Sequence, residues 1–311
     1  MNIMGVRSCL AAVLCIAVGV VLCLPAVALE QPREKQSEGA RQSAASFDIP
    51  KTAAEAKALV RRIIERQMTE DEKHGHSFMW VQKENGKRGV LTKEMVDTQE
   101  GIVARLIAIN DRPLTPAERQ ADDARLSRLL SDPQNRAQKL RQQQEDEKRT
   151  RNMVHALPDA FLYEPDGTMP GANGAELVRL RFKPDPSFDP PSRELQVYQG
   201  MEGFMLLDTR AQRLAEINAR LFRDVNFGWG ILGHLDKGGE FMVRQADVTG
   251  KHDWEVVAMK LKFDGKVLIF KPLHIRDDES ASNFRVVPEG MTFAQGVDLL
   301  RKQDSAVAEK K

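Results

Sequence analysis

Residues 200–208 have the sequence Gly-Met-Glu-Gly-Phe-Met-Leu-Leu-Asp, which is apolar at both alternating sets of positions. In a strand, successive side chains point to opposite faces of the sheet. Phe204 and Leu206 are therefore expected on one face, together with Asp208, and Met205 and Leu207 on the other. An antiparallel sheet with one face in water is apolar on one face only. The stretch thus predicts a sheet whose two faces are both covered, or one whose second face lines a cavity.

Later segments are also rich in apolar residues. Residues 225, 227, 229 and 231 are apolar and share one face of their expected strand, and the strand expected over 254–261 has apolar residues on both of its faces. Two interpretations stay open. The first is a helix-covered sheet with an ordinary core. The second is a curved sheet whose concave face holds an acyl chain or another apolar ligand. Under the second, the large apolar residues best placed to form the wall are Phe204, Leu206, Trp229 and Trp254.

Short strand-like segments separated by turns predict one large antiparallel sheet in the second half of the chain. We expect residues 164–175 to form a loop, and residues 214–221 to be a strand or a short helix. Asp264-Gly265 and residues 236–239 are expected to be hairpin turns. The other expected strands are 177–182, 194–198, 201–208, 224–232, 239–247, 254–263 and 266–274.

The first half of the chain predicts a helix, then strands, then charged helices. Thr52 and Glu55 form a capping box before a helix over about 53–69. Alternation around the Asn85-Gly86 turn predicts a three-strand meander over 77–109. Residues 116–152 are rich in charge and poor in large apolar side chains. They predict a helical insertion, as either a solvated lid or a protein-binding arm.

The N-terminus has the layout of a secretory signal peptide. Arg7 precedes an apolar run over 8–24, and Ala26-Val27-Ala28 supplies small residues for cleavage after Ala28. An uncleaved membrane anchor is the alternative, although the run is short for spanning a bilayer. We expect a signal peptide at 1–28, a flexible leader at 29–50 and a main domain at 51–291. The domain has its insertion at about 112–156, and a C-terminal helix and tail follow at 292–311.

Composition excludes several function classes. All three cysteines, Cys9, Cys15 and Cys23, fall within the expected signal peptide, which argues against a disulfide scaffold, a zinc ribbon or thiol catalysis. The 46 Lys and Arg residues balance 45 Asp and Glu, so a nucleic-acid partner is not expected. His74-Gly75-His76 and the acidic run 277–279 lack the spacing of a metal site. We therefore expect no metal, no cofactor and no catalytic residues.

This organisation resembles the outer-membrane lipoprotein carrier superfamily, that is, LolA-like proteins and the N-terminal part of the periplasmic sensor RseB. The resemblance lies in residues 200–208 and in Val225-Asn226-Phe227-Gly228-Trp229-Gly230, set in an exported chain of helix, meander, charged insertion and hairpins. It implies an α+β fold with a large curved antiparallel sheet, an unclosed half-barrel whose concave side is covered by helices.

The resemblance implies a periplasmic, non-enzymatic protein. It would bind a lipid, an acylated protein or another apolar ligand in a cleft between sheet and helices. One alternative is an envelope stress or protein-interaction module that uses the charged insertion, with an envelope protein as its partner. Another is an enzyme of unknown type. After signal cleavage the chain is not expected to span a membrane, because no later apolar stretch is long enough.

Overall fold

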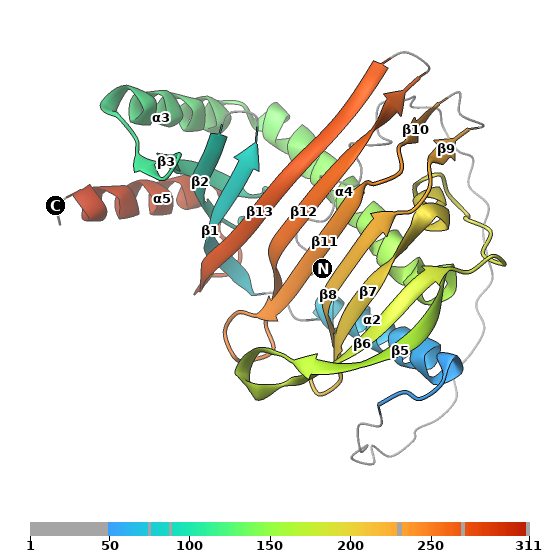
Figure 1. Cartoon of the computed structure of the whole chain (residues 1–311). Helices are drawn as coiled ribbons and strands as arrows, with labels where there is room; N and C mark the ends of the chain where they lie inside the picture. Colours follow the sequence, from blue (N-terminus) through green and yellow to red (C-terminus); the bar gives the residue numbers. More distant parts are fainter. Residues whose placement is uncertain (1–48, 74–75, 87–88, 229–231, 269–270, 309–311) are drawn as a thin grey trace, which may run out of the picture.

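The computed structural model describes residues 49–73, 76–86, 89–228, 232–268 and 271–308. These residues form an α+β fold around one antiparallel sheet of 13 strands, which does not close into a barrel (Figure 1). The strand order is β4-β3-β2-β1-β13-β12-β11-β8-β7-β6-β5, and β10 joins β9 to β12. The strands are β1 (Ser77–Gly86), β2 (Gly89–Val96), β3 (Val103–Ile109), β4 (Arg112–Pro113), β5 (Phe161–Pro170), β6 (Glu176–Pro184), β7 (Met201–Asp208), β8 (Arg213–Leu221), β9 (Val225–Phe227), β10 (Gly233–Leu235), β11 (Glu240–Asp247), β12 (Trp254–Val267) and β13 (Lys271–Val287).

The helices begin where the sequence predicts. At the start of α2, the Glu55 N–H donates to Thr52 Oγ1 over 3.2 Å and the Thr52 N–H donates to the Glu55 carboxylate over 3.3 Å. This reciprocal pair confirms the predicted capping box. The helices are α2 (Ala53–Lys73), α3 (Pro116–Ser131), α4 (Pro133–Ala160) and α5 (Phe293–Ala308), with short 3-10 helices η1 (Ala172–Gly174) and η2 (Glu194–Gly200).

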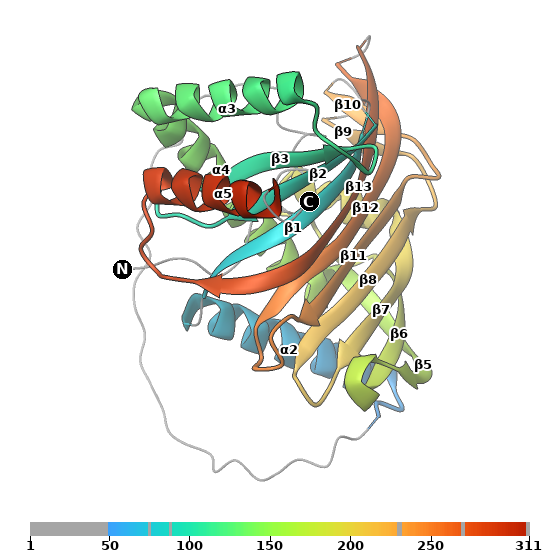
Figure 2. The same ribbon diagram turned by 90° about the vertical axis from the view of Figure 1, so that its left-hand side faces the viewer.

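The sheet is curved, and α2 and α4 lie on its concave side (Figure 2). The main core fills the space between them. Val60 and Ile63 of α2 and Met205 and Leu207 of β7 belong to this core and are fully buried. The two positions expected to share one face of residues 200–208 therefore point toward the helices, and burying them provides the hydrophobic stabilisation of this half of the fold.

A second, smaller core lies on the opposite face at the β1–β3 end of the sheet. Met79 of β1 and Val96 of β2 pack there against α5. The pairing registers of β1 with β13 and of β13 with β12 place Met79 on the other face from Met259 of the main core. Each end of the sheet thus has its own helical cover. α5 is the C-terminal helix expected at 292–311, and it buries Phe293, Val297 and Leu300 in this core.

The first helix of the charged insertion protects a sheet edge. Asp122 of α3 accepts the N–H of Leu106 in β3 over 3.2 Å, and the Arg125 guanidinium donates to the carbonyl of Ala104. Leu126 of α3 is fully buried in the second core. An unpaired strand edge can pair with other chains. Because α3 covers this edge, it has a structural role and is more than a solvated lid.

The second helix of the insertion is buried only at its C-terminal end. Residues 133–149 of α4 contain no buried side chain, whereas Thr150, Met153 and Leu157 are buried against the sheet. Pro158 lies inside the helix and cannot donate a backbone hydrogen bond there. The exposed half of α4 therefore depends on its own helical hydrogen bonds and on a few polar contacts, such as Arg136 with Glu100 at 3.2 Å.

We expect the amides of residues 137–149 to exchange with solvent at least about tenfold faster than those of β7, because local opening is easiest where little apolar area is buried. Hydrogen exchange followed by mass spectrometry measures this directly. The amides of α3 serve as the internal control, since that helix contributes the buried Leu126. Equal protection of the two α4 halves would contradict the expectation and indicate an unseen contact over the exposed half.

The prediction of a loop over 164–175 is wrong for residues 164–170. They continue β5, which pairs with β6 at the free edge of the sheet. Pro165 is tolerated because an edge strand has hydrogen-bond partners on one side only. The register shifts between Pro165 and Thr168, and Gly167 there has a φ of 85°. A bulge thus absorbs the residues that looked like turn signals.

The strand expected over 194–198 is also wrong, because Glu194–Gly200 forms the 3-10 helix η2. Leu195, Val197 and Tyr198 are nevertheless buried in the main core. A strand would send adjacent residues 197 and 198 to opposite faces, whereas here both reach the same core. Packing beneath α4 overrides the local strand preference.

Asp264-Gly265 is not a hairpin turn. β12 runs through to Val267, and Gly265 pairs with Leu273 of β13. A Cβ on Gly265 would overlap the backbone oxygen of His234 in β10. Glycine is required at this position because a third strand, β10, approaches closely. The neighbouring Asp264 forms an ion pair with Arg276. The acidic run 277–279 is part of β13.

Candidate functional site

An apolar pocket lies between the sheet and the helices of the concave side. α4 lines it with Met153, Val154 and Leu157. Its remaining volume is about 50 Å³, which is less than two water molecules occupy in the liquid. The pocket is thus nearly filled by its own side chains in this structure. The sheet, η2 and β5 line it with Phe161, Phe182, Tyr198, Met201, Leu214, Ile217, Ala219, Phe241 and Val243.

Two buried tyrosines hold the C-terminal part of α4 over the pocket by hydrogen bonds. The Tyr198 hydroxyl donates to the carbonyl oxygen of Met153 over 2.9 Å, and the Tyr163 hydroxyl donates to that of Leu157 over 2.6 Å. Burial raises the pKa of both phenols, so both remain protonated donors. The anchor of the helical cover is therefore at 153–157 and leaves residues 133–149 without a comparable attachment.

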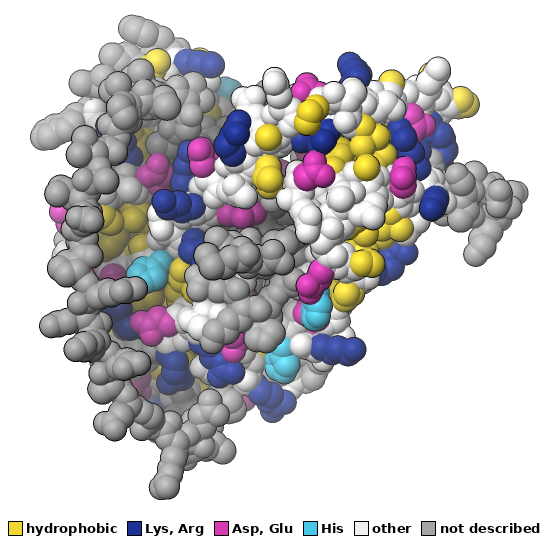
Figure 3. All heavy atoms as spheres, turned by 180° about the vertical axis from the view of Figure 1, so that it is seen from behind, with side chains coloured by type: hydrophobic (Ala, Val, Ile, Leu, Met, Phe, Trp, Pro, Cys, Tyr) yellow, Lys and Arg dark blue, Asp and Glu magenta, His cyan; other side chains and the backbone are white. Residues whose placement is uncertain are grey.

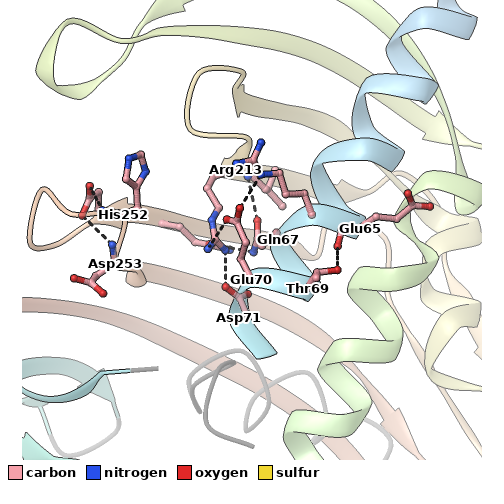
Figure 4. Close-up of polar contacts among 12 residues, drawn as sticks. Glu65, Gln67, Thr69, Glu70, Asp71, Arg213, His252 and Asp253 are labelled. Atoms are coloured by element: carbon pink, nitrogen blue, oxygen red, sulfur yellow. Dashed lines mark hydrogen bonds and ion pairs between the residues drawn. The ribbon is translucent and has the colours of Figure 1, made fainter. Parts of the chain in front are cut away.

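The pocket becomes polar at one end. Gln67 of α2, Thr150 of α4 and Gln245 of β11 are its polar lining. Gln67 accepts the backbone N–H of Leu214 over 3.2 Å, and its amide donates to Gln245 over 3.3 Å. This end lies where the last turns of α2 meet the beginning of β8, as Figure 4 shows.

A buried ion cluster adjoins that polar end. Arg213, at the start of β8, points toward Glu70 and Asp71 of α2 (Figure 4). Its guanidinium lies 2.5 Å from the Asp71 carboxylate and 3.3 Å from that of Glu70, while only 6% of the Arg213 side chain is exposed. Burial raises the pKa of Asp71, although the nearby Arg213 charge opposes the rise. The carboxylate is thus held in its charged form chiefly by this arginine.

The structure places three of the four sequence-predicted wall residues away from this pocket. Phe204, Leu206 and Trp254 pack together with Leu177 and Ala215 in a separate small cluster. The cluster lies on the face of β7 opposite to Met205 and Leu207. Alternation along residues 200–208 separated the two sets correctly, but alternation alone does not tell which set faces the concave side. Trp229 lies outside the described residues, and the strand expected over 224–232 is described only as β9.

A larger hollow, of about 780 Å³, lies on that outer face and includes Phe204 in its lining. Seven of its fifteen lining residues are charged, and four of these form two ion pairs with each other. Arg220 lies 2.7 Å from Glu202, and Lys183 lies 3.1 Å from Glu164. An apolar ligand would have to desolvate these pairs. The outer hollow therefore suits an acyl chain less well than the small concave pocket does.

Sequence reasoning missed the residues that line the concave pocket on α4 and η2. Met153 and Leu157 lie four residues apart in a helix that is otherwise polar, and this spacing was the available signal. Arg213 carried no signal, since an arginine after a hairpin is ordinarily solvated. Its burial arises only because α2 crosses the end of β8.

Three of the described histidines, His76, His234 and His274, lie beside carboxylates. His76 Nδ1 lies 2.8 Å from Asp253, and His274 Nδ1 lies 2.8 Å from Asp264. Across the described part of the chain, no group of three or more His, Cys, Asp or Glu side chains is arranged to hold a metal ion. Lys and Arg are interspersed with Asp and Glu over the face seen in Figure 3. Within the same described ranges, no helix is both long and apolar enough to cross a membrane.

Comparison with known proteins adds little to this description. No family model and no curated protein matches the chain. The chain is similar to a DUF1329 family protein from Desulfovibrio piger, whose crystal structure aligns with a TM-score of 0.28 and 12% sequence identity. The alignment covers 79% of this chain and 99% of the other. A likeness this weak carries no inference about function.

Proposed function

We propose that this chain is an exported, non-catalytic carrier that binds an apolar ligand in the pocket between the sheet and α4. The ligand class is a lipid or the acyl chain of an acylated protein. The proposal follows the resemblance to LolA-like half-barrels, and it is supported by the unclosed curved sheet with α2 and α4 on its concave side. The apolar lining of the pocket supports it further.

The observation that carries the proposal is the uneven attachment of α4 over an apolar pocket. An occupant of acyl-chain size needs far more room than the present 50 Å³. Residues 133–149 bury no side chain, so moving this half of the helix exposes little apolar surface. Release of the 153–157 anchor then opens the pocket lining to a ligand. The closed structure is the empty state in this scheme.

Export belongs to the same proposal. The signal peptide expected at 1–28 and the leader at 29–50 fall almost wholly outside the described residues. A periplasmic location rests on the sequence pattern of basic, apolar and small-residue segments. N-terminal sequencing of the protein recovered from a periplasmic fraction is expected to give Leu29 as the first residue.

One observation favours a second candidate, an envelope protein-interaction module. The exposed half of α4 presents both signs of charge, including Arg141, Glu145 and Lys148. A helix that packs so little against its own domain is available to a protein partner. In that case α4 is the binding surface itself, and the pocket beneath it is an ordinary core with a small packing defect.

Native mass spectrometry of the protein purified from a periplasm distinguishes the two candidates. The carrier proposal predicts co-purified acyl species on the parent protein and their loss in Val154→Trp. Val154 is half-buried and lines the pocket from α4, so an indole there occupies the binding volume. The helix can accommodate part of the added bulk toward solvent, which keeps the expected stability cost within about 1–3 kcal/mol.

Phe204→Ala is the matched control, since Phe204 is a large apolar residue of the outer cluster. It is expected to retain the acyl species at the parent level. Loss of ligand in Phe204→Ala with retention in Val154→Trp would place the binding site on the outer face. A parent protein that carries no acyl species, and takes up none when incubated with fatty acid, would contradict the carrier function and favour the interaction module.

A further inference from the structure

The polar end of the concave pocket is built differently from the rest of its wall. Its three polar residues, Gln67, Thr150 and Gln245, come from α2, α4 and β11, so they converge from three separate elements. Gln67 is 7% exposed and its carbonyl oxygen is used by the N–H of Leu214. An apolar ligand alone gains nothing from such groups, and burying them against a hydrocarbon tail is costly.

Arg213 lies immediately behind this end, because it precedes the pocket-lining Leu214 in β8. Its side chain is more than nine-tenths buried. Among the described residues, none accepts a hydrogen bond from its Nε. A guanidinium offers a fixed fork of donors that matches a planar or tetrahedral oxyanion. Arg213 therefore has donor capacity left over after pairing with Asp71 and Glu70.

Three further arginines, Arg62, Arg66 and Arg151, lie near the cluster. Arg66 pairs with Glu70 at 2.7 Å, and Arg62 donates to Gln212 over 3.2 Å in the adjoining hairpin. Arg151 of α4 is close enough to favour the ionised form of Asp71. Together with Arg213, these arginines place several guanidinium groups around the polar end of the pocket. An anionic group that reaches this end would be attracted by them.

We infer that the pocket takes an amphiphile with one anionic head and one apolar tail, with the head bound by Arg213 and the tail beneath α4. This inference rests on the proposed carrier function and names its ligand class. Gln67 and Gln245 form the polar passage between tail and head. Asp71 competes with the ligand for Arg213, and so holds the head-group site closed in the empty protein.

Two fluorescent probes of the same ring skeleton test this, anilinonaphthalene sulfonate with one fixed negative charge and the neutral phenylnaphthylamine. The parent protein is expected to bind the sulfonate about tenfold more tightly than the neutral probe, as one charged hydrogen bond implies. Asp71→Asn removes the competing carboxylate and is expected to tighten sulfonate binding several-fold. It should leave neutral-probe binding unchanged.

The double variant Asp71→Asn with Arg213→Gln is expected to lose the preference for the sulfonate while still binding the neutral probe, which shows that its pocket is intact. Arg220→Gln is the charge-matched control, because Arg220 pairs with Glu202 on the outer face. It should bind both probes as the parent does.

The outcomes separate the two levels of the proposal. Equal affinities for the two probes in the parent and in Asp71→Asn would overturn the head-group site and leave the carrier function standing. Binding of neither probe by the parent would overturn the carrier function, and the head-group site with it. Loss of sulfonate preference in Arg220→Gln would show that net charge, not Arg213, causes the preference, and would also overturn the inference.

Discussion

Replacing Gly203 by alanine is expected to destabilise the protein by about 3 kcal/mol or more. Gly203 is the third residue of β7 and pairs with Ala219 of β8. A Cβ at this position would overlap the backbone oxygen of Asn218 and lie 2.8 Å from the Cα of Ala219. Both are backbone atoms of the neighbouring strand, so no side-chain rotation can relieve the clash. β7 and β8 would have to separate at this point of the sheet.

Thermal unfolding measures this effect, with an expected fall in melting temperature of about 6–12 °C for a chain of this size. Gly86→Ala is the matched control. The nearest atom to a Cβ on Gly86 is the flexible Glu84 carboxylate, 3.8 Å away. That variant is expected to be neutral, or stabilised by up to about 1 kcal/mol through the unfolded chain. A Gly203→Ala protein with the melting temperature of the parent would mean that β7 and β8 are farther apart than in this structure.

The pattern of residues 200–208, together with the short strand-like segments and turns around it, predicted the sheet. Met205 and Leu207 are buried in the main core and Leu206 in the outer cluster, whereas Phe204 is half-buried and borders the outer hollow. The capping box at Thr52 placed the start of α2 correctly, and the helix expected within 292–311 is α5. These signals are local in sequence, and local physical chemistry determines them.

The errors arise where a distant segment decides the local structure. Residues 164–170 look like a loop, but they form an edge strand because β6 supplies partners on one side. Gly265 looks like a turn residue, but its glycine is needed where β10 crosses close to β12. A single sequence does not show which strands become neighbours, so neither case was predictable from composition or spacing.

The candidate site shows the same limit more sharply. Phe204 and Leu206 were assigned to a ligand wall because they are large and apolar, yet the same properties describe residues of the outer cluster. The curvature of the sheet and the position of α4 decide which face is concave. The pocket lining from Met153 and Tyr198 depends on the packing of α4 over η2, and that contact joins segments 45 residues apart.

Arg213→Gln is expected to cost about 3–5 kcal/mol, the range found when one partner of a buried ion pair is removed. Asp71 would then keep its buried position without the arginine that lies 2.5 Å away. Glu70 is less affected, since it is more exposed and retains Arg66. Urea unfolding of the single variants and of Arg213→Gln with Asp71→Asn measures the effect. The double variant is expected to recover most of the loss, because it leaves no uncompensated buried charge.

The pH dependence of this loss identifies its cause. Burial already raises the pKa of Asp71 in the folded parent, and losing Arg213 raises it further. The folded variant then binds a proton more tightly than the unfolded chain does. Its stability relative to the parent therefore rises as the pH falls through the folded pKa of Asp71. We expect the Arg213→Gln deficit to be largest at about pH 8 and clearly smaller at about pH 5. Carboxylates elsewhere, such as Asp159 and Asp264, titrate alike in both proteins and cancel in the difference. A deficit equal at the two pH values, or a double variant as unstable as the single one, would assign the loss to the packing of the long arginine side chain.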